Sequence, residues 1–271
     1  MAFGAVGVES VLIVAILVAI VAFFYSNLGL GGGQLYVPIM DFFFLSLVIK
    51  DVVPLSLCFA FVTMLGATYS HSKKGLVDFR LGGILAAAGL LGVAGGVAFT
   101  STAPEDAVKA GFAALLVVVA TKMLYDIYRQ RKEPAENPST FGLGQRLGGM
   151  GISILTGFLV GSFGIGGGVV SVPLIIYVFK VQTRRAIGTS ALMGAVLAPA
   201  AFVAYVLNES LGEGVVIHWD LALLLTPIVL VFALVGSRWG LERLKTKVVK
   251  TIFTCGVYLA ATEMIYSLLF T

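Results

Sequence analysis

Two glycine-rich segments of the same design contain the residues of this chain best suited to binding chemistry. Gly29–Pro38 reads Gly-Leu-Gly-Gly-Gly-Gln-Leu-Tyr-Val-Pro, and Gly164–Pro173 reads Gly-Ile-Gly-Gly-Gly-Val-Val-Ser-Val-Pro. Glycine disfavours a helix interior by roughly 1 kcal/mol and proline by about 3 kcal/mol, so each segment should break a helix. A helix that restarts after the glycines presents free N–H groups, which favour anions. The two glycine segments therefore predict a site for a small anion.

The composition places these segments in a membrane protein. Hydrophobic residues make up 59% of the chain and charged residues only 12%, whereas a soluble domain is about half apolar and a quarter charged. Uncharged runs such as Val11–Phe24 and Phe112–Thr121 belong to stretches that approach the length of a bilayer span. We predict an all-α polytopic membrane protein with the lipid bilayer as its partner. The net charge of +4 comes from loop residues and indicates no nucleic-acid partner.

The chain contains an internal duplication on either side of a polar linker, residues 129–146. Val108–Phe112 matches Val249–Phe253, and Thr121–Tyr125 matches Thr262–Tyr266, in both cases 141 residues later. Each repeat is predicted to hold a glycine-broken first helix followed by three transmembrane helices. The first repeat spans 1–128, with membrane segments at about 8–25, 35–49, 52–71, 81–100 and 105–128; the second spans 147–271, with segments at about 147–163, 169–180, 185–206, 221–238 and 248–270.

The basic loops indicate that the two repeats are inverted relative to each other. Their positions differ between the halves: Lys73, Lys74 and Arg80 in the first, and Lys180, Arg184 and Arg185 in the second. If basic loops stay in the cytoplasm, each half crosses the membrane an odd number of times or includes a re-entrant pair. The linker is then cytoplasmic, and both termini lie outside. Whether the first two arms of each half span the bilayer or form a re-entrant hairpin stays open at this point.

Inverted halves bring the two glycine segments to the bilayer midplane from opposite faces, as in transporters with broken helices. The predicted substrate-binding residues are the glycines and nearby polar side chains, with no lysine or arginine among them. For Ser56 and Ser190, a helix–helix hydrogen bond is an equally good interpretation. The complete predicted set is Gly29, Gly31, Gly32, Gly33, Gln34, Gly164, Gly166, Gly167, Gly168, Ser171, Thr189, Ser190 and Ser56.

Other polar residues carry weaker signals. Asp41 and Glu263 are the candidates for ion coupling, because ionisable residues at membrane depth are usually functional. His71 and His218 lie at expected loop edges, where we expect them to face water or lipid headgroups. The sequence offers no nucleophile, metal cluster or paired acids at membrane depth, so we expect neither an enzyme nor a cofactor or metal. Proton or sodium coupling stays open.

The doubled Gly-x-Gly-Gly-Gly-x-x-x-Val-Pro pattern, with Thr189-Ser190 following the second copy, resembles the TauE/SafE sulfite exporter family, also called TSUP. The likeness covers essentially the whole chain. It implies transport of sulfite or organosulfonates such as sulfoacetate across a bacterial or archaeal inner membrane, with the pocket built from both glycine runs and Thr189-Ser190. Leu55-Ser56 in the first half departs from the Thr-Ser pattern.

The leading prediction is a secondary transporter of a small anion that works by alternating access. A channel-like conduit for small anions is the alternative. The anion, the direction of transport, the coupling ion and the oligomeric state are not indicated by the sequence.

Overall fold

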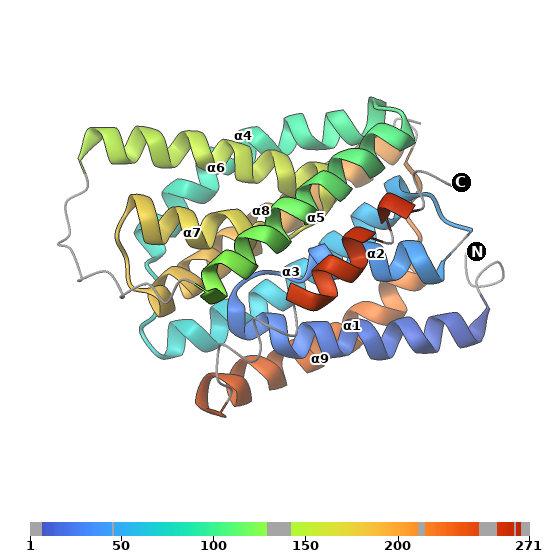
Figure 1. Ribbon diagram of the computed structural model, residues 1–271, viewed down its shortest axis with the longest axis horizontal. Coiled ribbons are helices and arrows are strands. Elements are labelled where there is room, and N and C mark those ends of the chain that lie inside the picture. The colour runs from blue at the N-terminus through green and yellow to red at the C-terminus, as the bar shows by residue number, and fades with distance from the viewer. Residues whose placement is uncertain are drawn as a thin grey trace.

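The computed structural model describes residues 7–44, 46–128, 142–210, 215–243, 254–262 and 264–266, and throughout these ranges the chain is helical with short connections (Figure 1). Residues 254–262 and 264–266 are helical as well. The labelled helices are α1 (Val8–Leu28), α2 (Gly33–Phe43), α3 (Ile49–Lys73), α4 (Phe79–Thr102), α5 (Glu105–Tyr128), α6 (Leu143–Phe163), α7 (Gly168–Val178), α8 (Thr183–Ser210) and α9 (Trp219–Arg243).

Six of the described helices are long and apolar enough to cross a bilayer. They are α1, α3, α4, α6, α8 and α9, with lengths between 21 and 28 residues, and a span needs about 20 residues. Many of their large apolar side chains face outward, for example Leu91 and Leu223, which are 72% and 73% exposed. An outward apolar surface of this kind is suited to lipid rather than water. The structure confirms the prediction of an all-α polytopic membrane protein.

Each glycine segment separates a long helix from a short one. α1 and α6 have 21 residues each, whereas α2 and α7 have 11 each. Eleven residues extend about 16 Å, roughly half of the ~30 Å hydrocarbon core. Neither α2 nor α7 can therefore cross the membrane alone, and the second arm of each half is a half-length helix.

Two helix boundaries differ from the sequence-based expectation. The arm predicted at 35–49 ends at Phe43, and Ile49 begins α3 with Asp51 in its first turn, where an acidic residue favours the helix dipole. α6 begins at Leu143, inside the predicted linker. There the Gln145 side chain accepts the N–H of Gly142 at 3.1 Å and donates to the Val178 carbonyl at 3.0 Å, which extends the helix start by about one turn.

α4 packs closely along α6, and α1 along α9, on opposite sides of the bundle (Figure 1). Glycines make the α4–α6 contact close: a methyl group at Gly92 or Gly96 would overlap the Ile154 or Phe158 carbonyl of α6. Small residues of this kind let membrane helices approach backbone to backbone.

α3 and α8 pack against each other in antiparallel fashion. At one end, Gly188 near the start of α8 contacts His71 near the end of α3. At the other end, Asp51 near the start of α3 bonds the backbone of Val216, which follows α8. This pairing is what inverted halves would produce; the inverted relation itself stays a prediction.

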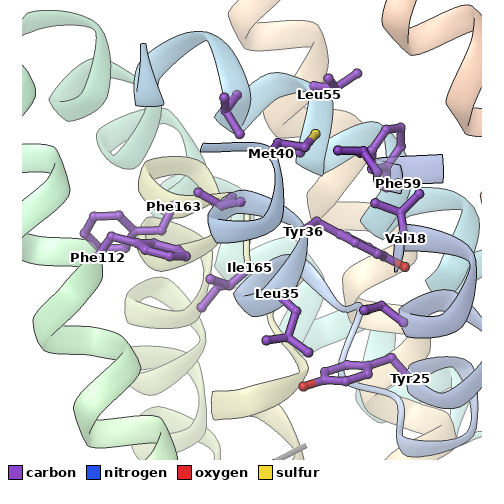
Figure 2. Packing of buried hydrophobic residues seen from close by; sticks show 14 of the residues in the cluster. Val18, Tyr25, Leu35, Tyr36, Met40, Leu55, Phe59, Phe112, Phe163 and Ile165 are labelled. Atoms are coloured by element: carbon purple, nitrogen blue, oxygen red, sulfur yellow. The ribbon is translucent and has the colours of Figure 1, made fainter. Parts of the chain in front are cut away.

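α2 packs against α1 and α3 of the first half of the chain. Figure 2 shows Tyr36 and Met40 of α2 among Leu55 and Phe59 of α3, and the Tyr36 and Phe59 rings meet edge to face at 5.6 Å. All four side chains are at most 2% exposed. The first turns of the half-length helix are thus buried in protein. The non-helical glycine segment beside it needs the same burial, because such backbone is tolerated at membrane depth only where protein covers it.

Candidate functional site

Six glycines make the two helix breaks possible. Both breaks use the left-handed backbone region, which costs a residue with a Cβ about 1–2 kcal/mol. Gly29 and Gly164 end α1 and α6 in this conformation, and Gly32 and Gly167 stand at the N-cap positions of α2 and α7. The positive φ angles are Gly29 60°, Gly31 81°, Gly32 90°, Gly164 66°, Gly166 72° and Gly167 82°.

The two breaks contact each other directly. A methyl group at Gly33 would overlap the carbonyl oxygen of Gly164, and one at Gly168 would overlap the carbonyl oxygen of Gly29. Between these two contacts, a methyl group at Gly31 would lie 2.9 Å from the Cα of Gly166. We call this contact of residues 29–33 with 164–168 the glycine crossing. Only glycine allows backbones to approach this closely.

The glycine crossing lies beside the middle of α3. Gly31 faces Met64, and Gly166 faces Ala60, and both α3 residues are at least nine positions from the ends of the helix at Ile49 and Lys73. Figure 2 shows Ile165, from the second break, next to Leu35 of α2. The N-termini of α2 and α7 therefore meet near the centre of the bundle.

Two serines of the central helices hold the glycine crossing from both sides. Ser56 of α3 donates to the Gly164 carbonyl at 3.0 Å, and Ser190 of α8 donates to the Gly29 carbonyl at 3.2 Å. Each serine therefore bonds the broken helix of the opposite half. Ser190 also lies 2.7 Å from Ser171 in α7 and can accept its hydroxyl proton, which is otherwise donated to the Gly167 carbonyl at 2.9 Å. These bonds satisfy carbonyls that the helix ends leave open.

Gln34, in the first turn of α2, is a buried amide with an unusual environment. Its side chain is 0% exposed, and no described group makes a hydrogen bond of good geometry to either amide atom. The Tyr25 side chain lies near it as a hydrogen-bond partner of poor geometry. Next to it, the Tyr36 ring covers Gly32, and the Tyr36 hydroxyl lies 2.9 Å from the Thr63 hydroxyl. A buried polar group without a partner is costly, so Gln34 has hydrogen-bonding capacity available for a ligand.

A pair of ionisable residues lies at each end of the α3–α8 pair. At the start of α3, Asp51 accepts the N–H of Val216 at 2.8 Å and lies 3.8 Å from the His218 ring nitrogen. At the start of α8, Arg185 lies 3.7 Å from Asp78. In both cases a residue at a helix start meets the connection that precedes α4 or α9 in the opposite half.

The connection before α4 is tied to α8 by more than this ion pair. The N–H of Asp78 donates to the Thr189 hydroxyl at 3.0 Å, and the Asp78 carboxylate caps α4 by accepting the Leu81 N–H at 2.9 Å. Thr189 therefore points to the start of α4, whereas its neighbour Ser190 points to the glycine crossing.

Comparison with known proteins shows the family of this chain. Residues 14–264 match the profile of the family described as "Sulfite exporter TauE/SafE", which is nearly the whole chain. The chain belongs to the TauE/SafE family. It is accordingly a multi-pass membrane transporter, and the family resemblance drawn from the glycine segments is confirmed.

Relatives in this family carry transporter names. The chain is 25% identical over 269 residues to the probable membrane transporter protein YunE of Bacillus subtilis, covering 91% of this chain and 94% of that protein. It is 27% identical over 226 residues to a probable membrane transporter protein of Haemophilus influenzae, covering 81% and 82%. It is 26% identical over 183 residues to YdhB of Bacillus subtilis, covering 66% and 72%. No solved structure matches this TauE/SafE protein.

Most of the predicted site residues gather at the glycine crossing. The structure places the glycines, Ser56, Ser171 and Ser190 there, Gln34 in the adjoining turn of α2, and Thr189 near the start of α4. Sequence analysis missed Tyr25 and Thr63. A tyrosine in an otherwise apolar span was the available signal for Tyr25, whereas Thr63 is recognisable only through its contact with Tyr36.

Proposed function

We propose that this TauE/SafE protein is a secondary carrier of a small anion, with sulfite or an organosulfonate such as sulfoacetate as the substrate class. The observation that carries the proposal is the glycine crossing, where the N-termini of α2 and α7 meet beside the middle of α3. Each N-terminus holds about half a positive charge and N–H donors that precede the first bonded turn. Two such ends together favour one anion.

The absence of fixed charge supports a carrier that must release its substrate. Among the described residues, no lysine, arginine, aspartate or glutamate is buried. An anion at the crossing would therefore be held by backbone dipoles and by neutral groups such as the Gln34 amide. Backbone N–H groups in a water-poor site bind an oxyanion well without the tight hold of a buried ion pair.

The ion pairs at the two ends support alternating access. Asp51–His218 and Arg185–Asp78 lie at opposite ends of the α3–α8 pair, where they can act as gates to the crossing. A carrier would open one pair at a time. In the proposed orientation, residues 129–146 and the Arg185 end face the cytoplasm of a bacterium or archaeon.

Counterflow tests the proposal. Purified protein is reconstituted in vesicles loaded with unlabelled sulfite, sulfoacetate, sulfate, thiosulfate or taurine, and uptake of the labelled anion is followed against its gradient. A carrier accumulates label transiently by exchange, whereas a conduit only dissipates the gradient. Accumulation with a sulfur oxyanion supports the proposal. Simple dissipation would favour the conduit, and the absence of any flux would refute the substrate class.

The inverted arrangement has its own test. Single cysteines in place of Lys74 and Arg184 are labelled with a membrane-impermeant thiol reagent in intact cells and in inverted vesicles. Both positions should be labelled only in inverted vesicles. Labelling of the two from opposite sides would overturn the inverted repeats and leave the anion site standing.

A further inference from the structure

His71 is a buried histidine with no role in the transport cycle proposed above. It lies in the last turn of α3 and is 1% exposed, so the expectation that it faces water or lipid headgroups is wrong. The end of α1 and the start of α8 cover it. Its ring faces the backbone of Ser26, yet no described group makes a hydrogen bond of good geometry to either ring nitrogen.

The second half shows what a purely structural residue does at the equivalent position. Tyr205 of α8 lies 134 residues after His71, the same spacing as between Ser56 and Ser190. Its hydroxyl donates to the Gly161 carbonyl at 2.6 Å, and Gly161 lies 135 residues after Ser26. At this helix–helix contact, the second half has a tyrosine whose hydroxyl is hydrogen-bonded. The first half has an ionisable imidazole whose ring nitrogens lack a hydrogen bond of good geometry.

Two further buried polar atoms without a hydrogen bond belong to the same helices as His71 and Ser26. Thr68 precedes His71 by three positions, on the same face of α3, and Asn27 follows Ser26 in α1. No hydrogen bond is made to the Thr68 hydroxyl or to the Asn27 side-chain oxygen, and both atoms are buried. Polar atoms of this kind can conduct a proton through ordered water.

Cationic groups lie near His71, and together with burial they disfavour its imidazolium form. Lys74 follows it in the chain and acts on it electrostatically, and Arg185 is compensated by Asp78. On α9, Arg238 lies over the Tyr69 ring. The Cβ of His71 also lies against Gly188 of α8, and the preceding residue, Ile187, lies against Gly29 of the glycine crossing.

We propose that His71 is the proton-coupling residue of this transporter. This inference rests on the proposed function and names the ion that drives it. The neutral imidazole takes up one proton from the Arg185 end, becomes an imidazolium, and supplies one positive charge within the same bundle as the bound anion. The proton is then released either on the same side of the membrane as the anion or on the opposite side, and its release restores the neutral ring. Because the protein buries no fixed cation among its described residues, the coupling charge is present only when the proton is.

The transport test separates exchange from coupling. The variant His71→Gln keeps the size and polarity of the side chain and removes its basicity, while Tyr205→Phe is the matched control in the other half. Labelled sulfoacetate is used, or labelled sulfite if only sulfite exchanges in the wild-type protein. We expect His71→Gln to retain counterflow and to lose accumulation driven by a pH gradient, and Tyr205→Phe to retain both. Gradient-driven accumulation by His71→Gln would overturn the inference.

Failure of the proposed function is distinguishable from failure of this inference. Absence of wild-type counterflow refutes the carrier, whereas wild-type counterflow that ignores the pH gradient refutes only the role of His71. A titration of His71 that needs no substrate tests the inference independently. The chain has two histidines, so His218→Gln leaves one imidazole for nitrogen NMR in detergent. It should exchange its proton reversibly as the pH is lowered; a ring that stays neutral over the whole pH range in which the protein is folded would overturn the proposal.

Discussion

At the first glycine segment the residue that follows the glycines is Gln34, whereas at the second it is Val169. The same contrast continues around each break: Tyr25 corresponds to Val160, and Tyr36 to Ser171. The backbones are nevertheless alike, with positive φ angles at equivalent glycines. The comparison teaches that close contact at the crossing constrains the glycines in both halves, while the side chains beside them are free to differ. An anion at the crossing would therefore meet the Gln34 amide on the first half and the apolar Val169 at the equivalent position of the second.

The two ends of the α3–α8 pair differ in the same way. α3 begins with Asp51, an acid that the helix dipole favours, and α8 begins with Arg184 and Arg185, which the dipole disfavours. Asp78 compensates Arg185, and the Thr189 hydroxyl and the cap of α4 anchor Asp78.

The largest expected effect comes from substituting the glycines that form the crossing in both halves. Gly33→Ala and Gly168→Ala each place a methyl group on a carbonyl of the opposite half, so both should abolish counterflow. Overpacking should also lower the unfolding free energy by about 1–3 kcal/mol or more. Thermal unfolding and counterflow measure both effects. Gly83→Ala is the control, because a methyl group there meets nothing within 4 Å. Normal exchange by Gly33→Ala would show that the crossing is not maintained.

Exchanging Gln34 and Val169, which differ between the two breaks, should change stability and transport in different directions. Gln34→Val gives the first half the residue of the second and removes a buried amide without a partner, so the unfolding free energy should rise by about 1–3 kcal/mol. Transport should fall sharply at the same time. Val169→Gln, the reverse exchange, should destabilise the protein. The readouts are thermal unfolding with and without sulfite or sulfoacetate, and counterflow. A Gln34→Val protein with unchanged transport would exclude the amide from the site.

The smallest effects should come from the two serines. Ser56 makes one hydrogen bond at the crossing, and Ser190 contacts both Ser171 and Gly29. Hydrogen bonds between membrane helices average about 0.6 kcal/mol, so Ser190→Ala should cost roughly twice as much stability as Ser56→Ala. Chemical denaturation of both variants and of the double variant measures the difference. Equal losses would indicate that the Ser171 contact contributes nothing.

The sequence predicted elements whose cause is local and missed those whose cause is a distant contact. The helix breaks follow from glycine and proline alone, and their pairing in two halves follows from the repeat. His71 was misplaced because its neighbours in the chain, Lys73 and Lys74, suggest a water-exposed loop. The residues that bury it, Ser26 and Gly188, belong to α1 and α8. Thr63 was missed for the same reason, since its partner Tyr36 lies 27 residues away.

The sequence by itself determined that this chain spans a membrane and that two matching glycine segments each break a helix. Those properties depend on hydrophobicity and backbone preference, which act residue by residue. Only the tertiary structure decided that the two breaks touch, that Ser56 and Ser190 each bond the opposite half, and that His71 and Tyr205 differ in hydrogen bonding. The physical reason is that burial and hydrogen-bond partners are properties of pairs of segments, and neither segment of a pair specifies the other.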